Sequence, residues 1–505
     1  MIARTLGLPL LTIEVNGRPL AEEARTLIGE VRVSQKLSLP AQCEVSFFSQ
    51  PSASATASLI PGASLRVAVG EGPPLFAGEV TAFEYSYEPA QGRRFRVRGY
   101  DRLHRLRKRQ PVRAHVQVGL AELARELTSG LGISVEAPSG ALTWQRLIQH
   151  AQTDFDLLAQ IAEACGLYFT LRGDTLHLIT LEGIGDPIPL ALGDALLEAR
   201  IEMNSEHACQ GVAADGWNPL RAEEHEGHAR RPRGGGSVSA LAAPNRAGGG
   251  TECVVVNLAV QNDAHAEALA QAELDLRAAR ESVVRGVAEG DSRLQPGTRV
   301  DVQGVSPTVA GRYVLTEVTH LLNERQRFVS EISSYPMALT PRVGATSALM
   351  GRVTSVNDPE GLGRVQVALP TCNDVETNWM GVVAAGAGAN KGWAMLPDVG
   401  DTVLVLCAHG NPAMGIVLGG LYGAGGPPDA GVEGRAVKRF TFRTPGGQYL
   451  RFDDGEKMVQ FQNANGSSIE LGPQKVVVHS EADLRIEAPG KRITVCGNAI
   501  DFEQG

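Results

Sequence analysis

The chain has 505 residues, of which 43% are apolar and 20% charged, an ordinary globular composition whose length predicts about three or four domains. Its 58 Gly and 28 Pro indicate many turns and short strands. The formal net charge of -9 gives no overall basic field to attract phosphate backbones, so we expect no nucleic-acid partner.

Seven cysteines are scattered along the chain without a CxxC pair. This pattern predicts buried thiols in a reducing compartment, and neither a disulfide framework nor a zinc site. The N-terminal segment runs directly into a strand pattern, so we expect cytoplasmic synthesis without a cleavable signal peptide. No stretch approaches about 18 consecutive apolar residues, so we expect no transmembrane helix.

The first half of the chain divides by its periodicity. Residues 1–100 show short alternating strands and an Asn16-Gly17 hairpin signal, which predict a β-barrel. Residues 101–195 contain two stretches with helical spacing, one of them starting at a capping Thr153 and stopping at Gly166. We therefore expect an α+β segment after the first barrel.

Residues 196–340 predict a second β-barrel that also contains a helix from about Ala264 to Glu281. A glycine- and arginine-rich stretch within it predicts a mobile loop over residues 220–250. Residues 341–425 again form a small barrel of five strand-like runs, and the first turn, "NDPEGLG", has the composition of a hairpin loop. Residues 426–439 are a linker.

Residues 440–505 have a different period, with apolar residues in i, i+2 pairs about every eight residues. Such short strands would leave one apolar face and long edges bare in a monomer, so several copies wound around an axis as a β-helix are expected. A plain antiparallel meander is the alternative. The predicted apolar core of this needle is Leu450, Phe452, Val459, Phe461, Ile469, Leu471, Val476, Val478, Leu484, Ile486, Ile493, Val495, Ile500 and Phe502.

The ordered motifs "DPEGLGRV", "GWAMLPDVGDTVLV" and "GNPAMGIVLGGLYG" resemble the OB-fold of VgrG-type spikes and phage baseplate spikes. Upstream, "GYDRLHRLRKR" and the segments after it are similar to the hub half of the same family. The motif residues are turn and scaffold positions: Asp358, Pro359, Gly361, Gly363, Arg364, Trp379, Trp393, Pro397, Gly400, Asp401, Gly410, Asn411, Pro412, Gly419 and Tyr422.

The resemblance implies a mainly β protein with an α+β insert, two hub β-barrels, an OB-fold collar and an intertwined trimeric β-helix. It implies a homotrimeric, membrane-puncturing spike of a contractile injection system: a type VI secretion spike, a phage-tail-like particle or a myophage tail. The implied partners are a PAAR-repeat tip protein, a tube protein, baseplate components, effector cargo and the target envelope. The protein would be assembled into the baseplate of the particle.

We expect no enzyme, cofactor or metal site. The linker between Tyr422 and Phe440 is too short to hold a hydrolase domain. His225 and His228 have the spacing H-x-x-H, which differs from H-E-x-x-H and indicates a solvated loop.

The other polar and aromatic groups that could suggest a binding or catalytic site are expected to have structural roles. The basic stretch 102–113 lacks interleaved aromatic residues and is expected to pair with acidic neighbours in an assembly. The carboxylate pairs Asp154/Asp156 and Asp453/Asp454 fit a helix start and a turn. Trp379, Trp393 and Tyr422 are expected to pack and not to stack on a ligand. The alternative function is an OB-fold protein that binds, or hydrolyses, carbohydrate or peptidoglycan.

Overall fold

The structure is a computed structural model that describes residues 11–88, 92–138, 142–234, 236, 252–336 and 346–502. The chain divides into two compact units, residues 1–420 and 421–505. Strands far outnumber helices, which confirms the expected mainly β class. Within the described ranges, no helix combines the length and the apolar character needed to cross a lipid bilayer.

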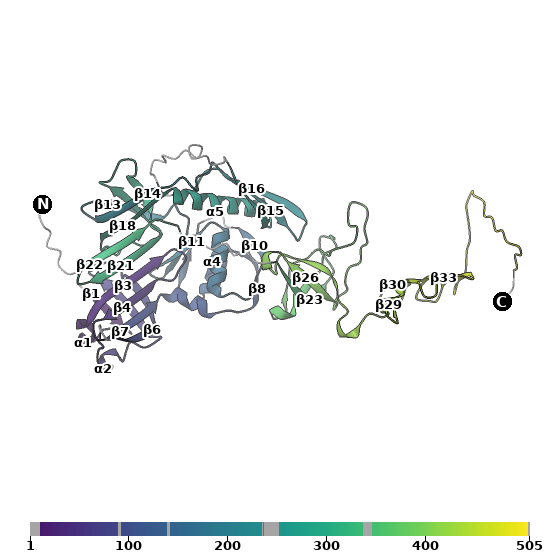
Figure 1. The fold of residues 1–505 in the computed structure, drawn as a ribbon, viewed down its shortest axis with the longest axis horizontal. Coiled ribbons are helices and arrows are strands. Elements are labelled where there is room, and N and C mark those ends of the chain that lie inside the picture. The colour runs from purple at the N-terminus through teal and green to yellow at the C-terminus, as the bar shows by residue number, and fades with distance from the viewer. Residues whose placement is uncertain are drawn as a thin grey trace. The chain divides into compact units, whose positions relative to one another are not determined.

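An eleven-stranded sheet runs through the first unit in the order β14-β18-β22-β21-β3-β4-β7-β6-β5-β1-β2 (Figure 1). Its strands are β1 (Leu11–Val15), β2 (Arg18–Pro19), β3 (Ile28–Lys36), β4 (Gln42–Phe47), β5 (Ser64–Val69), β6 (Phe76–Glu88), β7 (Gly92–Tyr100), β14 (Leu196–Met203), β18 (Ser282–Glu289), β21 (Glu317–Asn323) and β22 (Arg327–Ser333). Short helices α1 (Glu22–Thr26) and α2 (Ala53–Thr56) interrupt the first part. The two predicted barrels therefore contribute to one hydrogen-bonded sheet, joined where β3 pairs antiparallel with β21.

Each half of this sheet has its own apolar core. One core contains Val33, Val67 and Phe95 from the first hundred residues. The other contains Val284 and Ile332 and is shared with a three-stranded sheet. That smaller sheet consists of β13 (Ile184–Ala191), β19 (Thr298–Gln303) and β20 (Gly311–Val314). Periodicity predicted two β-barrels, whereas the pairing that joins their strands in one sheet is visible only in the structure.

The predicted α+β segment is present between the two halves. Its elements are η1 (Arg102–Lys108), β8 (Arg113–Gly119), α3 (Leu120–Thr128), β9 (Ser134–Glu136), β10 (Thr143–Gln149), α4 (Asp154–Ala164), β11 (Tyr168–Arg172) and β12 (Thr175–Ile179). Helix α4 begins after Thr153, whose hydroxyl accepts a hydrogen bond from Asp156 N–H at 3.1 Å. It ends before Gly166, where φ is 64°. Both predicted ends of this helix are confirmed.

A second small lobe contains the H-x-x-H stretch that was expected to lie in a solvated loop. It consists of β15 (Val212–Asn218), β16 (Glu223–Ala229), β17 (Cys253–Ala259) and α5 (Asp263–Glu281). The H-x-x-H stretch is strand β16, paired with β15 and packed on α5, and is therefore not a solvated loop. A Cβ at Gly227 would lie about 2.1 Å from Glu267 N, so only glycine fits there. The rest of the predicted mobile loop, residues 237–250, lies outside the described residues.

The small barrel after residue 346 has the sheet order β25-β24-β23-β26-β27. The strands are β23 (Ser347–Ser355), β24 (Gln366–Leu369), β25 (Val375–Glu376), β26 (Thr402–Cys407) and β27 (Gly415–Gly420). The predicted third run, "NWMGVVAA", makes only isolated bridges and no full strand. The barrel core includes Val367 and Val405, and Leu220 from the turn after β15 is buried in the same cluster.

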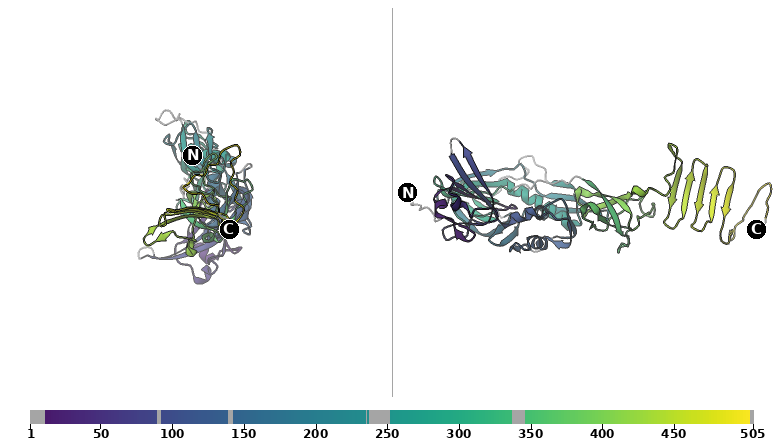
Figure 2. Two further views of the ribbon diagram at one scale, coloured as in Figure 1. Left: turned by 90° about the vertical axis from the view of Figure 1, so that its right-hand side faces the viewer. Right: turned by 90° about the horizontal axis from the view of Figure 1, so that it is seen from below.

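The second unit contains one flat, antiparallel meander, seen on the right of Figure 2. Its strands are β30 (Arg439–Arg443), β31 (Tyr449–Asp453), β32 (Met458–Gln462), β33 (Ser468–Leu471) and β34 (Val476–His479). A two-stranded ribbon, β28 (Val432–Glu433) and β29 (Ala436–Val437), precedes it. Residues 480–502 form no strand in the single chain. The trimeric β-helix stays a prediction.

We predict that Leu220→Ala weakens the small barrel by about 3 kcal/mol, because removing a buried leucine leaves a cavity in its core. Hydrogen exchange at β23 and β26 is the appropriate measurement, since a multidomain chain does not unfold in two states. Leu362→Ala is the matched control, because Leu362 is exposed on the same barrel. Equal changes in protection for the two variants would contradict the packing of Leu220 in this core.

Candidate functional site

The loop between β23 and β24 is organised by one carboxylate, that of Asp358. Its oxygens accept hydrogen bonds from Glu360 N–H at 3.1 Å and from Leu362 N–H at 2.9 Å. Gly361 and Gly363 have φ values of 67° and 69°, in the left-handed region that glycine tolerates best. The loop conformation thus depends on two glycines and on a carboxylate that replaces backbone acceptors.

Asp358 also forms a bidentate ion pair with Arg364. The two hydrogen bonds measure 2.7 and 3.0 Å, and the side chains are only 3% and 7% exposed. Hydrogen bonds from Arg364, followed by those from the loop N–H groups, hold the pKa of Asp358 well below its usual range. A carboxylate that stays ionised in this way has no proton to exchange, so the pair is structural.

The same loop is tied to the hub. Glu360 accepts from Arg364 at 3.1 Å and from Arg221 at 2.8 Å, and Arg221 belongs to the turn between β15 and β16. At β25, the Arg146 guanidinium of β10 donates to the carbonyl oxygen of Glu376. Together with the buried Leu220, these contacts fix the barrel to two separate parts of the first unit.

The remaining motif residues are mostly turn formers. All except Gly419 lie outside the strands: Pro359, Trp379, Trp393, Pro397, Gly400, Asp401, Gly410, Asn411, Pro412 and Tyr422. The Asp401 carboxylate accepts from Asp398 N–H at 2.8 Å. Trp379 is half-buried as expected. Trp393 and Tyr422, however, are 64% and 70% exposed, so the expectation that they pack is wrong within one chain.

The predicted needle residues share one face of the meander. Leu450 lies opposite Phe461, Phe461 opposite Ile469, and Ile469 opposite Val478, so the register aligns the apolar row strand by strand. Eight predicted core residues are on β31 to β34, and most are exposed. The other six follow β34 outside any strand: Leu484, Ile486, Ile493, Val495, Ile500 and Phe502.

Two residues of this face were missed by the sequence prediction. Phe440 and Phe442 of β30 lie opposite Phe452 and Leu450 and extend the apolar row by one strand. Their i, i+2 spacing in "RFTFR" was the signal that could have identified them.

The opposite face of the meander is polar and satisfied by its own hydrogen bonds. Gln460 donates to Glu470 at 3.0 Å, and the Tyr449 hydroxyl donates to Gln462 at 2.6 Å. Only the apolar face therefore lacks partners.

The basic stretch 102–113 pairs within its own chain. Arg105 binds Glu79 of β6, and the Arg107 guanidinium lies over the Phe155 ring, 4.7 Å from its centroid. These two residues of the stretch thus have partners inside their own chain. The expected pairing of the stretch with acidic neighbours in an assembly stays a prediction.

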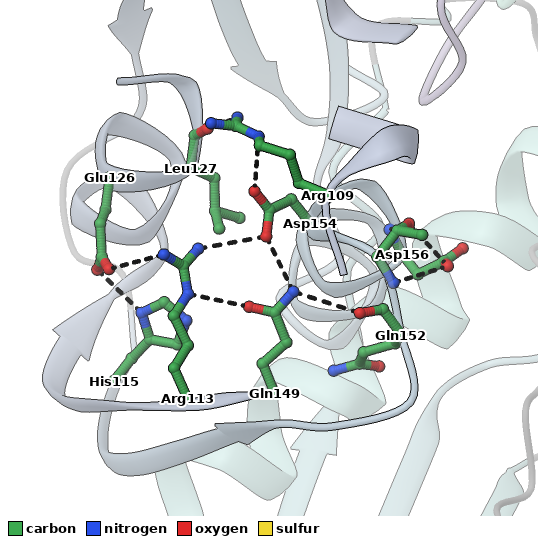
Figure 3. A network of polar contacts seen from close by, with 10 residues as sticks. Arg109, Arg113, His115, Glu126, Leu127, Gln149, Gln152, Asp154 and Asp156 are labelled. Carbon is green, nitrogen blue, oxygen red and sulfur yellow. Dashed lines mark hydrogen bonds and ion pairs between the residues drawn. The ribbon is translucent and has the colours of Figure 1, made fainter. Parts of the chain in front are cut away.

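The end of this stretch meets a buried carboxylate (Figure 3). Asp154, whose side chain is 2% exposed, forms an ion pair with Arg109 at 3.0 Å and accepts hydrogen bonds from Arg113 at 3.2 Å and from Gln149 at 2.9 Å. Gln149 in turn accepts from Arg113 at 3.1 Å. These groups come from β8, β10, α4 and the residue that follows η1, so the network holds the α+β segment together, and the Asp154 carboxylate is not free for catalysis.

The other polar clusters among the described residues are also structural. His225 is bound to Asp263 at 2.7 Å, and Asp453 accepts from Glu456 N–H in a turn at 3.0 Å. Across the described part of the chain, no three His, Cys, Asp or Glu side chains converge in a way that could hold a metal ion.

The cysteines are all free thiols. Burial raises the pKa of Cys43, that of Cys165 to about 12 and that of Cys407 to about 11, so these thiols are unreactive. Cys496 is exposed, contrary to the expectation of buried thiols throughout.

Family models match two parts of the chain. Residues 8–324 match the Alg8 N-terminal domain, and residues 349–422 match the type VI secretion system/phage-baseplate injector OB domain. The second match confirms the OB-fold expected for the small barrel. A search of curated protein sequences finds no match.

Two solved structures share the fold. One is the E. coli c3393 protein, described as a component of the type VI secretion system similar to T4 bacteriophage tail proteins gp27 and gp5: 14% identity, 81% of this chain, 99% of that chain, TM-score 0.53. The other is a chain of the half-lidded Francisella PdpA-VgrG complex: 9% identity, 93% of this chain, 87% of that chain, TM-score 0.53. The resemblance to VgrG-type and baseplate hub-spike proteins is confirmed.

We predict that Asp358→Asn destabilises the OB domain by about 3 kcal/mol, because Arg364 would remain buried without a charged acceptor. Hydrogen exchange of β23 and β24 measures the loss. Asp374→Asn is the control, since Asp374 is exposed and its φ of 54° suits asparagine. If the amides of β23 and β24 are as well protected in Asp358→Asn as in the control variant, the ion pair does not hold the loop.

A second prediction concerns acid. Hydrogen bonds from Arg105, and then from His104, lower the pKa of Glu79 from 4.5 to about 2. Its stabilising contribution is therefore complete above the unfolded pKa and lost as the pH falls from 4.5 towards 2. The loss of amide protection that Glu79→Gln causes in β6 and β7 should shrink over that window, as measured by hydrogen exchange at several pH values. A difference that does not change with pH would show that Glu79 does not act through its charge.

Proposed function

The chain belongs to the family of the Alg8 N-terminal domain, joined to an injector OB domain in the fold of VgrG-type hub-spike proteins, and we propose that it is the homotrimeric spike of a contractile injection system. It acts mechanically and without catalysis: the sheath's contraction is transmitted through the spike to the target envelope.

One observation carries the proposal, the uncovered apolar face of residues 440–478. In a single chain, side chains such as Phe461 and Val478 face solvent although the polar side of the same sheet is satisfied. An apolar face of this size calls for a partner surface. Three copies wound around an axis would bury the row of each chain and pair the bare edges of β30 and β34.

The same arrangement explains residues 480–502. Their apolar pairs continue the spacing of the meander, but the single chain offers them no strand to pair with. In a trimer, neighbouring copies would supply those hydrogen bonds, and the needle would extend to Phe502. Phe502 is 95% exposed and suits an apolar contact with a PAAR-repeat tip protein.

The hub and OB domains would serve as anchor and collar. The hub would join the tube protein and the baseplate components, and effectors would be delivered with the spike. Leu220 and the ion pairs of Glu360 attach the collar to the hub, so force applied to the hub reaches the OB domain without a loose joint. The glycan-binding or hydrolytic alternative has no supporting group, because the candidate carboxylates among the described residues are engaged in structural contacts.

We predict that the full-length chain has the solution mass of three chains. A version that ends at residue 438 should have a mass close to that of one chain. Light scattering coupled to size exclusion measures both masses. A stable full-length monomer would refute the trimeric needle.

Adjacent valines provide a sharper test. Val478→Glu places a charge in the apolar row and should abolish the trimer, whereas Val477→Glu changes the opposite face, where Glu470 lies directly across, and should preserve it. Equal loss of the trimer in both variants would mean that the apolar row is not the interface.

A further inference from the structure

Four of the seven cysteines share an apolar core with a second cysteine. Cys209 and Cys253 pack on the core of the small lobe that β15, β16, β17 and α5 form. Cys372, at the end of η3 (Pro370–Cys372), and Cys407, at the end of β26, belong to the core of the OB domain. Each of these cores therefore holds two free thiols from different segments of the chain, as a disulfide requires.

The parallel pairing of β15 and β17 brings the two thiols of the lobe together. Cys253 N–H donates to the Gly211 carbonyl at 3.0 Å, and Cys253 lies directly opposite Val212. Residues paired in this way point to the same side of a sheet, so the Cys253 side chain faces the lobe core together with Val212. Cys209 lies just before Gly211 in the chain and packs on the same core. The two thiols thus meet where β17 begins.

The electrostatics of Cys209 agree with this placement. Burial raises the pKa of the Cys209 thiol, Arg277 of α5 opposes the shift, and the neighbouring Cys253 adds to it. Two thiols influence each other in this way only when they are close in space, because a thiolate at one position disfavours a second one. A bond between the two sulfurs would remove both ionisable groups from the core.

Exposure separates the pair in the lobe from the pair in the OB domain. Cys209 and Cys253 are both partly exposed, whereas Cys372 and Cys407 are buried, at 5% and 0% exposure. Thiol–disulfide exchange begins when a thiolate attacks a reagent, so the reagent must reach at least one sulfur. We therefore expect the lobe pair to react and the OB pair to stay reduced.

We propose that Cys209 and Cys253 are a modification site at which a low-molecular-weight disulfide, such as oxidised glutathione, forms an intramolecular disulfide. One cysteine thiolate attacks the reagent and releases a small thiolate, and the second cysteine then attacks the mixed disulfide and releases another. Each released thiolate takes up the proton that a cysteine has lost. The protein is oxidised by two electrons, and the reagent is reduced to two thiols.

The disulfide would hold β17 in place. β17 lies at the edge of its sheet, next to β15 alone, and its pairing shifts register between Ala214 and Gly216. A bond from its first residue to Cys209 closes residues 210–252 into a loop and restricts the unfolded lobe. The reducing cytoplasm would keep the two thiols apart, and oxidising surroundings outside the cell would link them. The lobe would therefore become more stable after release.

The test treats the full-length Cys496→Ser chain with oxidised glutathione, because the exposed Cys496 would otherwise link separate copies. Peptide mapping without reduction should find Cys209 joined to Cys253, and dithiothreitol should reverse the link. Cys372 and Cys407 should be recovered as free thiols from the same sample.

Hydrogen exchange measures the effect of the link on the lobe. Oxidation should slow exchange in β15 and β17 by about tenfold or more. Cys253→Ser should abolish this response to the oxidant. Cys165→Ser is the matched control and should keep the response, because Cys165 is also partly exposed but packs on a different core.

Three results would overturn the inference. Glutathione attached to Cys209 or Cys253 without a link between them would mean that the sulfurs are reachable but wrongly placed. No reaction at either residue would mean that the site is closed to the reagent. Equal linking of Cys372 with Cys407 would mean that oxidation follows unfolding. None of these results bears on the proposed trimer, because both cysteines lie in the first unit of one chain.

Discussion

The antiparallel pairing of β3 with β21 is the contact on which the first unit depends. It aligns seven residue pairs, from Glu30 and Asn323 to Lys36 and Glu317, across a separation of about 285 residues. One side of the pair is apolar and includes the fully buried His320, whose pKa burial lowers to about 4. The other side is closed by polar contacts such as Lys36–Glu317 at 2.8 Å. Without this pairing the two cores would be separate domains, and such distant strands are slow to find each other.

The buried charged side chains of this protein mainly hold neighbouring segments of the chain together. Asp358, Asp154 and Glu79 each bind an arginine and further donors in places where loops or helices must be held. Such pairs are costly to bury, and their value is positional, because each has one geometry that satisfies every group. One face of the meander, by contrast, is apolar and exposed in the single chain.

The sequence predicted what is decided locally. The cap at Thr153, the glycines of the Asp358 loop and the i, i+2 rows of the meander all follow from short-range rules, and the structure has each of them. It could not predict features that depend on contacts between segments far apart in the chain. Strand β16 has the charged composition of a loop and becomes a strand because β15 and α5 cover it. Tryptophan is typical of a core, yet Trp393 is exposed, because among the described residues no other segment of the chain covers it.

Part of the predicted linker, residues 426–439, is bound to the meander in the structure. Asp429 accepts from Arg439 at 3.0 Å and from Gly431 N–H at 2.8 Å, and it lies 3.5 Å from Arg451 of β31. These contacts bind the end of the linker to the first strands of the meander. The connection that remains runs from Leu421 to Pro428, and two consecutive prolines stiffen its last part. In the proposed spike a short connection would be an advantage, because fewer flexible residues could bend under load.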